Sequence, residues 1–324
     1  MKFPHARIRF ASVLLFAILS VNFLAAQDLR PGAGRLLDKS PDGHVQGQAP
    51  TRQPAVVQGN GINYHNGPVL KGNPVPIYVI WYGNWTNGPL ASDSAVTVSL
   101  VEAFLASTAL GGSGYEAINS TYGDTTGNVS GHLGFSSAVF DSSYSSGKKL
   151  SDRVLPTVVS HAIAAGLPSD ANGVYLILTS SDVSESSGFC RTYCGFHTHA
   201  TIGGADIKYA FIGNVDKCQN GCEAQTTGPN SPSAGVGGAD GMINVITHET
   251  EEAITDPDLN AWFDASGNED ADKCNFKFGP TQIAPNGSHF NQTFGGKNWL
   301  IQMEWENSRG GGCDQTLGGA FFTN

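Results

Sequence analysis

Three runs that are apolar throughout, or apolar apart from Lys208 in the third, predict buried β-strands in the middle of the chain. They cover residues 77–82, 174–178 and 207–212, and all three are rich in β-branched and aromatic side chains. Pro76 and Gly83 bound the first run, which fixes its length at that of a strand. Because apolar positions are continuous rather than alternating, each strand is expected to be covered on both faces.

Two stretches between these runs have apolar positions at helical spacing. The first stretch spans residues 92–109. It begins with Ser92-Asp93-Ser94, which can cap a helix, and Gly111 lies just after its end. Residues 151–165 end at Gly166, with Pro156 tolerated near the first turn. Strands and helices therefore alternate, which predicts an α/β fold with a mixed sheet flanked by helices in a single domain.

The first 60 residues have a different pattern. Lys2, Arg7 and Arg9 precede a short apolar run that ends at Ala25-Ala26, the order of a secretory signal peptide over residues 1–26. Residues 27–60 are rich in Pro, Gly and Gln without apolar periodicity, so we expect a flexible N-terminal arm. The folded domain is expected over residues 61–324, and the protein is expected to be secreted, outside the cell or in a periplasm.

Composition narrows the class of partner. Charged residues make up only 14% of the chain, which has 41 glycines and a net charge of −10, becoming −13 once the three basic residues of the signal peptide are removed. Nucleic acids and anionic membranes require clustered positive charge, so neither is an expected partner, and no further segment could span a membrane. Glycine-rich nucleotide loops and the Gly-x-Ser-x-Gly elbow of serine hydrolases are absent from the sequence.

Six cysteines suit an oxidising compartment. Spacing alone leaves 15 pairings open, and we expect bridges within the 190–222 segment and a separate Cys274–Cys313 bridge. A zinc site built from Cys-x-x-x-Cys pairs is the alternative, although an exported thiol cluster tends to oxidise. The four cysteines of the first segment are Cys190, Cys194, Cys218 and Cys222.

Candidate chemistry lies in a predicted helix over residues 240–256, with Asp240 as its cap and Pro257 after its end. His248 and Glu252 are four residues apart and share one face, with Glu249 beside them. This is the His-Glu-x-x-His arrangement of metallohydrolases with a carboxylate in place of the second histidine: His248 and Glu252 would bind a metal, and Glu249 would deprotonate a bound water. Acidic residues crowd the carboxyl-terminal half of the helix, where its dipole disfavours them, and a cation would offset that cost.

A third ligand can be placed in two ways. Asp258 follows His248 by ten residues, as in metzincin-type sites, although Thr255 replaces their glycine; Asp272 or Glu269 would supply a carboxylate from a following element. His197 and His199 would share one face of a strand and are secondary candidates. A zincin-like site with Zn²⁺ is expected, but so few imidazoles leave Mn²⁺ and Ca²⁺ open.

An ordered set of short motifs resembles the EXORDIUM / phosphate-induced protein family. The motifs extend from residue 64 to residue 313: Tyr64-His-Asn-Gly-Pro-Val-Leu70, Pro76-Ile-Tyr-Val-Ile-Trp-Tyr-Gly83, Ser181-Asp-Val183, Gly188-Phe-Cys190, Cys194-Gly-x-His197, Tyr209-Ala-Phe-Ile-Gly-Asn214 and Cys218-x-x-x-Cys222. The resemblance implies a secreted, wall- or matrix-associated protein without a settled biochemical activity. The segment from His248 to Pro257 resembles the bacterial branch of the family.

Two functions of different class remain open. One is a secreted metal-dependent, peptidase-like hydrolase acting on an extracellular peptide, with the Gly228 to Gly238 stretch as a mobile loop beside its site. The other is a noncatalytic protein that binds a cell-wall polymer or peptide and carries a structural metal. Four tryptophans could stack on sugars, although burial in the core is the commoner fate: Trp81, Trp85, Trp262 and Trp299. A glycosidase with paired carboxylates is a third hypothesis, for which no carboxylate separation can be given.

Overall fold

A computed structural model describes Met1 and residues 61–322, apart from 232 and 234. The predicted signal peptide, apart from Met1, and the whole of the predicted N-terminal arm lie outside the described residues. The described chain is a single mixed α/β domain. None of its helices is long and apolar enough to cross a lipid bilayer.

A five-stranded sheet with the order β5-β2-β7-β10-β9 forms the centre of the domain. Its strands are β2 (Val75–Tyr82), β5 (Leu133–Asp141), β7 (Val174–Thr179), β9 (Gly195–Ile202) and β10 (Ala205–Gly213). The first three and β10 run parallel, whereas β9 pairs antiparallel with β10 and makes the sheet mixed. All three predicted strands are confirmed. The edge strands β5 and β9 were not among them, because each carries polar residues that interrupt the apolar pattern.

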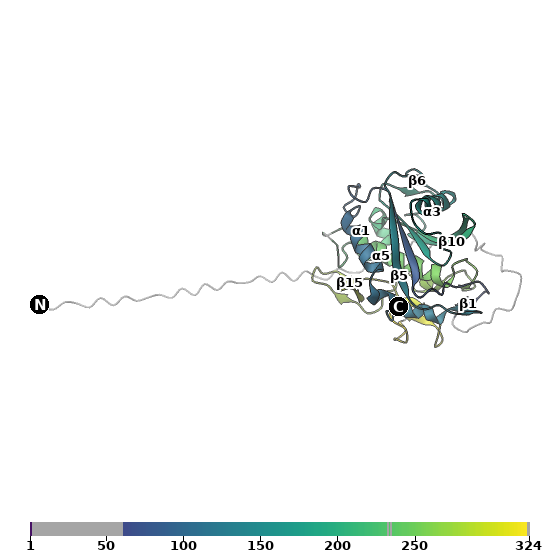
Figure 1. The fold of residues 1–324 in the computed structure, drawn as a ribbon. Helices are drawn as coiled ribbons and strands as arrows, with labels where there is room; N and C mark the ends of the chain where they lie inside the picture. The colour runs from purple at the N-terminus through teal and green to yellow at the C-terminus, as the bar shows by residue number, and fades with distance from the viewer. Residues whose placement is uncertain (2–60, 232, 234, 323–324) are drawn as a thin grey trace.

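Helices cover both faces of the sheet (Figure 1). The longer ones are α1 (Ala95–Leu105), α3 (Leu155–Ala164) and α5 (Gly238–Thr255), and the one-turn helices are α2 (Thr108–Gly111), α4 (Gln219–Cys222) and α6 (Asp270–Lys273). Short 3-10 helices are η1 (Glu116–Thr121), η2 (Asp152–Val154) and η3 (Val215–Cys218). One apolar cluster joins α1 and α5 to the sheet, and a second joins α3 to its opposite face.

Two predicted helix boundaries were wrong. The helix expected over 92–109 is split, because Ser94 caps α1 and Ser107, which accepts a hydrogen bond from the backbone N–H of Leu110, caps α2. Asp240 does not cap its helix: α5 begins after Gly237, and Asp240 lies in the first turn. There its carboxylate accepts hydrogen bonds from the backbone and side chain of Asn230, which tie the preceding loop to the helix.

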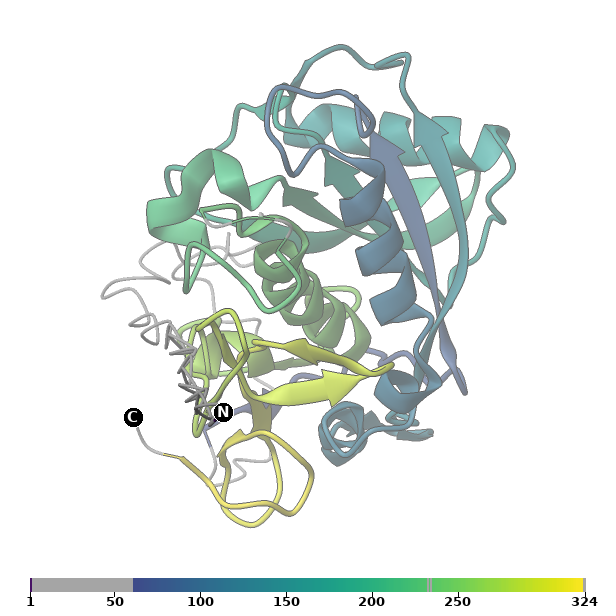
Figure 2. The ribbon, with the colours of Figure 1, turned by 90° about the vertical axis from the view of Figure 1, so that its left-hand side faces the viewer.

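Two-stranded ribbons make up most of the remaining regular structure. They pair β1 (Asn63–Tyr64) with β11 (Trp262–Phe263), β3 (Gly123–Asp124) with β4 (Gly127–Asn128), β6 (Lys149–Leu150) with β8 (Ser184–Glu185), β12 (Gln282–Ile283) with β13 (His289–Phe290), β14 (Gln292–Phe294) with β15 (Lys297–Trp299), and β16 (Glu304–Glu306) with β17 (Gly312–Asp314). Figure 2 shows the yellow-green C-terminal ribbons lying beside α5. The helix is therefore enclosed between the sheet and the C-terminal segment.

All six cysteines form disulfides: Cys190–Cys218, Cys194–Cys222 and Cys274–Cys313. The expected division into a 190–222 group and a separate bridge is confirmed, and no thiol remains for a zinc site. The four tryptophans considered for sugar stacking are buried, Trp81 completely. The disulfides and the apolar core together stabilise a domain whose C-terminal third contains few long helices or strands.

Candidate metal centre

Helix α5 carries the predicted ligands into the interior of the domain. Because the sheet lies on one side of α5 and the C-terminal segment on the other, its polar residues are buried together with its apolar ones. Glu252 is 0% exposed, Glu249 1% and His248 5%. The acidic helix is therefore not a solvated surface element, and its buried charges need partners.

Strand β9 brings His197 to the same place. The strand pairs with β10 so that His197 lies opposite Ala210 and His199 opposite Lys208, on the face that packs against α5. The two histidines share one face, as the sequence indicated, but only His197 reaches Glu252. Its Nδ1 lies 3.4 Å from Glu252 Oε2, and its Nε2 lies 3.3 Å from the backbone oxygen of Asp256. With Nε2 as the donor of that hydrogen bond, Nδ1 keeps a free lone pair facing Glu252.

A glutamine fixes the other imidazole. Gln302 Nε2 donates to the backbone oxygen of Ala271 at 2.9 Å, and Gln302 Oε1 accepts from the backbone N–H of Phe276 at 3.3 Å. The amide orientation is thus determined, and Oε1 accepts a further hydrogen bond from His248 Nδ1 at 3.2 Å. His248 Nδ1 therefore carries a proton in either charge state of the ring, and Nε2 is the nitrogen that faces Glu252 Oε1 at 3.2 Å and Asp272 Oδ1 at 3.9 Å.

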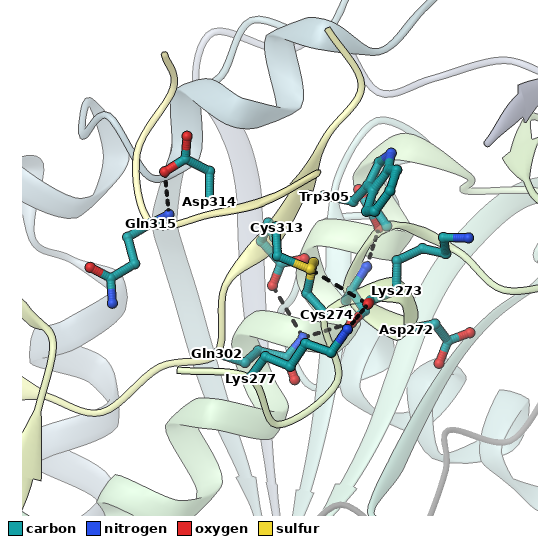
Figure 3. Close-up of a disulfide and its surroundings, with 12 residues drawn as sticks. Asp272, Lys273, Cys274, Lys277, Gln302, Trp305, Cys313, Asp314 and Gln315 are labelled. Carbon is teal, nitrogen blue, oxygen red and sulfur yellow. Dashed lines mark hydrogen bonds between the residues drawn. A yellow bond between two sulfur atoms is a disulfide. The ribbon is translucent and has the colours of Figure 1, made fainter. Parts of the chain in front are cut away.

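Further carboxylates come from the short helix α6 and the residue before it. Glu269 Oε1 lies 3.6 Å from His197 Nε2, and the backbone N–H of Asp272 donates to Glu252 Oε1 at 3.2 Å. Figure 3 shows Asp272 and Gln302 near the Cys274–Cys313 disulfide, which joins the end of α6 to β17. The disulfide therefore holds the carboxylate segment beside α5.

The electrostatics of the centre are dominated by burial and by the two histidines. Burial alone would raise the pKa of Glu252, but His248 and His197 outweigh it and lower that pKa to about 2. Burial opposes protonation of His248, but Glu252 outweighs it and holds the pKa of His248 well above its ordinary value. Burial also raises the pKa of Glu249 well above its usual range, and burial and then Glu252 raise that of Asp272 to about 7. Without a cation, protons compensate these carboxylates.

Two groups of side chains with metal-ligand geometry share Glu252. One consists of His248, Glu252 and Asp272, the other of His197, Glu249 and Glu252, and within each group the ligand atoms lie within 4.8 Å of one another. Four of the buried atoms have no hydrogen-bond partner among the described residues: His197 Nδ1, His248 Nε2, Glu249 Oε2 and Glu252 Oε2. Buried polar atoms in native proteins are normally satisfied, so these four indicate a missing ligand.

Asp258 does not join the His248 group. It lies with His199 and Asp206 in a third group, where the Lys208 ammonium is 3.1 Å from Asp258 and 2.9 Å from Asp206. A lysine already supplies positive charge there, so this group is an ion-pair network. Among the residues that spacing offered as a third ligand, Asp272 lies near His248 and Asp258 lies beside Lys208.

A small recess reaches the centre from the side of the disulfide Cys194–Cys222. Its walls include Cys194, Gly195, Phe276 and Gln302, with His248 and Glu249 among the lining residues, and its cavity volume is about 10 Å³, room for about one water molecule. A Cβ atom on Gly195 would lie 2.6 Å from Glu249 Oε1, so only glycine leaves that carboxylate its space. One oxygen of Glu249 thus faces the recess, while Oε2 is buried.

A second buried acidic cluster lies next to the centre on another face of α5. Glu251 accepts a hydrogen bond from Asn119 and contacts Glu116, and Glu304 accepts one from Tyr115 at 2.9 Å. Burial raises the pKa of Glu116 to about 8 and that of Glu251 well above its usual range. A proton shared between Glu116 and Glu251 accounts for two carboxyl groups in contact. No metal-ligand group among the described residues includes them.

Sequence comparison places the chain in a known family. The family model described as "Phosphate-induced protein 1 conserved region" matches residues 62–308. Protein EXORDIUM-like 5 of Arabidopsis thaliana is 34% identical over 274 residues, covering 75% of each chain. Protein EXORDIUM-like 3 of the same plant is 33% identical over 225 residues, covering 62% of this chain and 64% of the relative. No solved structure matches. The chain therefore belongs to the EXORDIUM-like, phosphate-induced protein 1 family.

Proposed function

We propose that this protein is a secreted metal-dependent hydrolase whose centre is built on His248, Glu252 and Asp272. One observation carries the proposal: Gln302 engages Nδ1 of His248, so Nε2 faces two carboxylates beside a recess, where a cation would take the place of its proton. Disulfide pairing of all six cysteines supports an oxidising, extracellular location. In this proposal α5 has the part that the metal-binding helix has in zincins.

The chemistry follows from what a divalent cation does to water. A bound cation lowers the pKa of a water molecule toward neutrality and thereby supplies a nucleophile. Glu249 would accept a proton from a water molecule in the recess, because its Oε1 lies beside Gly195, which lines the recess, and because burial raises its pKa. Hydrolysis of an extracellular peptide is the reaction class we propose.

The donor set favours Zn²⁺, with Mn²⁺ as the next choice. Imidazole nitrogen and carboxylate oxygen together suit both ions, whereas Ca²⁺ takes oxygen ligands. The sequence alone suggested a site poor in imidazole. With His197 beside Glu252, the site has two histidines, which moves the preference away from Ca²⁺.

A specific observation favours a second candidate function. The recess has a cavity volume of only about 10 Å³, and His248, Glu249 and Glu252 are almost completely buried. A peptide needs a wider site than this, whereas a structural cation does not. The second candidate is therefore a noncatalytic extracellular protein that binds a peptide or cell-wall polymer and whose metal holds α5 against α6.

Metal analysis combined with peptide cleavage tests the proposal. The purified mature protein is expected to contain stoichiometric Zn²⁺ and to cleave casein or a peptide library. Glu249→Gln is expected to retain metal at His248 and to lose cleavage, because the amide cannot accept the proton. Parent protein without stoichiometric metal would overturn the proposal. Metal present without any cleavage, with Glu249→Gln indistinguishable from the parent, would favour the noncatalytic function.

Gln302 is a positioning residue that the sequence analysis did not identify, since a lone glutamine in an irregular segment has no motif. Gln302→Leu is expected to lower metal affinity about 10- to 100-fold, the usual effect of losing the hydrogen bond behind a histidine ligand. Gln302→Glu keeps an acceptor for His248 Nδ1 and is expected to retain more of the affinity. Competition with a chromogenic chelator measures both, and equal affinities of Gln302→Leu and the parent would contradict the role.

A further inference from the structure

We propose that the centre binds two divalent cations, with Glu252 as the carboxylate that bridges them. One cation is held by His248, Glu252 and Asp272, and the other by His197, Glu252 and the buried Oε2 of Glu249, which leaves Glu249 Oε1, beside Gly195, for the proton transfer of the proposed function. The inference rests on the proposed metal site and adds a second ion to it. It also assigns a role to His197, which lies on β9 and outside the His-Glu-x-x-Glu segment of α5.

The two oxygens of Glu252 face different histidines. Oε1 is 3.2 Å from His248 Nε2, and Oε2 is 3.4 Å from His197 Nδ1. Each of these nitrogens lies opposite a ring nitrogen that is engaged elsewhere, by Gln302 in one imidazole and by the backbone oxygen of Asp256 in the other. His248 Nε2 and His197 Nδ1 therefore each face a different oxygen of the same carboxylate. This is the arrangement expected of a carboxylate that bridges two cations.

The distances fit co-ligands of a metal better than direct hydrogen bonds. A charge-assisted hydrogen bond between imidazole and carboxylate is about 2.7–2.9 Å long. Two ligand atoms that each lie about 2.1 Å from one tetrahedral ion are roughly 3.4 Å apart. The separations of 3.2 and 3.4 Å around Glu252 are closer to the second value. The second position has ligand atoms of its own. They are buried and have no hydrogen-bond partner among the described residues: His197 Nδ1, Glu252 Oε2 and Glu249 Oε2.

Charge supports the same stoichiometry. Three carboxyl groups meet beside the two histidines: those of Glu249 and Glu252, which are buried, and that of Asp272, which is partly buried. No Lys or Arg within the described residues forms an ion pair with Glu249, Glu252 or Asp272. One dication would leave one negative charge uncompensated when all three groups are ionised, and a second would offset it. Paired ions about 3.5–4 Å apart form the catalytic centres of many hydrolases that cleave peptide bonds or phosphate esters.

Metal stoichiometry tests the inference on the whole mature protein. After removal of metal with a chelator, titration with Mn²⁺ is expected to give two bound ions per chain and an exchange-coupled electron paramagnetic resonance spectrum. Zn²⁺ is expected to bind with the same stoichiometry. One Mn²⁺ per chain would overturn the second site and leave the proposed function intact. No bound Mn²⁺ or Zn²⁺ would overturn both.

Two histidine variants on one strand locate the second ion. His197→Gln is expected to reduce the stoichiometry from two to one and to abolish the coupled spectrum. His199→Gln, two residues along β9 in the Lys208 ion-pair network, is the matched control and is expected to keep two ions. Loss of one ion in His199→Gln but not in His197→Gln would place the second ion away from Glu252 and overturn the inference. Should His197→Gln fail to fold, the stoichiometry and spectrum of the parent decide.

Discussion

Glu252→Gln is expected to abolish divalent-cation binding and to lower the free energy of unfolding of the metal-free protein by about 3–5 kcal/mol, the usual cost of removing one partner of a buried ion pair. Glu252 is completely buried and lies between the two imidazoles. Its carboxylate is what holds the pKa of His248 well above its ordinary value against the effect of burial. An amide gives His248 no counter-charge and cannot bridge two cations.

Glu251→Gln is the matched control one residue away on the same helix. The Glu251 side chain belongs to the neighbouring acidic cluster, where burial and Glu116 raise its pKa well above its usual range, so its neutral form is already favoured. The amide retains an acceptor for Asn119 and gains a donor toward Glu116. We expect full cation binding and a change in unfolding free energy within about 1 kcal/mol.

Urea denaturation at pH 6 in the presence of a chelator measures both variants. This pH lies above the ordinary pKa of a glutamate and below that of a histidine, so the Glu252–His248 pair is charged in the folded protein. The raised pKa of His248 contributes stability that is lost as pH rises through its folded value, and the lowered pKa of Glu252 contributes stability that is lost as pH falls through about 2. If Glu252→Gln and Glu251→Gln lowered the free energy of unfolding equally, the loss would come from replacing any buried carboxyl group on α5 and not from the Glu252–His248 ion pair.

The parts of the fold that the sequence predicted are those with a local signal. The three central strands are continuous apolar runs, and α5 has His248 and Glu252 at helical spacing before Pro257. Cysteine grouping also predicted the separate Cys274–Cys313 bridge. Each of these features is determined within a few residues of chain or by a simple pairing rule, so tertiary contacts did not override it.

The rest of the site depends on contacts between distant segments. His197 reaches Glu252 only because β9 pairs antiparallel with β10 in a register that places it opposite Ala210. Gln302 lies in an irregular segment, and its role appears only when its amide is seen between His248 and Ala271. Spacing also could not separate Asp258 from Asp272, since the turn after α5 sends Asp258 toward Lys208 instead. Long-range register and irregular backbone therefore determine which acidic residues join the metal ligands.

The metal-free protein is expected to lose stability as pH rises from 5 to 8, and Glu116→Gln is expected to remove the share of that loss that comes from Glu116. Burial raises the pKa of Glu116 from its ordinary value of 4.5 to about 8. The folded state therefore binds a proton across this window that the unfolded state releases. Each pH unit of such a difference is worth about 1.4 kcal/mol for one proton, so the total is of the order of 4 kcal/mol between pH 5 and 8.

The sign of this dependence distinguishes Glu116 from carboxylates with lowered pKa values. Arg309 leads the interactions that lower the pKa of Glu306 to about 2, so the contribution of Glu306 is lost only as pH falls below the range of an unfolded glutamate. Glu306→Gln is accordingly expected to shift the unfolding free energy by a constant amount between pH 5 and 8, whereas Glu116→Gln changes its slope. Urea denaturation at four pH values in this range, with chelator present, measures both slopes. A Glu116→Gln slope equal to that of the parent would contradict a proton held in the Glu116–Glu251 pair, and the buried acidic cluster would then be charged at neutral pH.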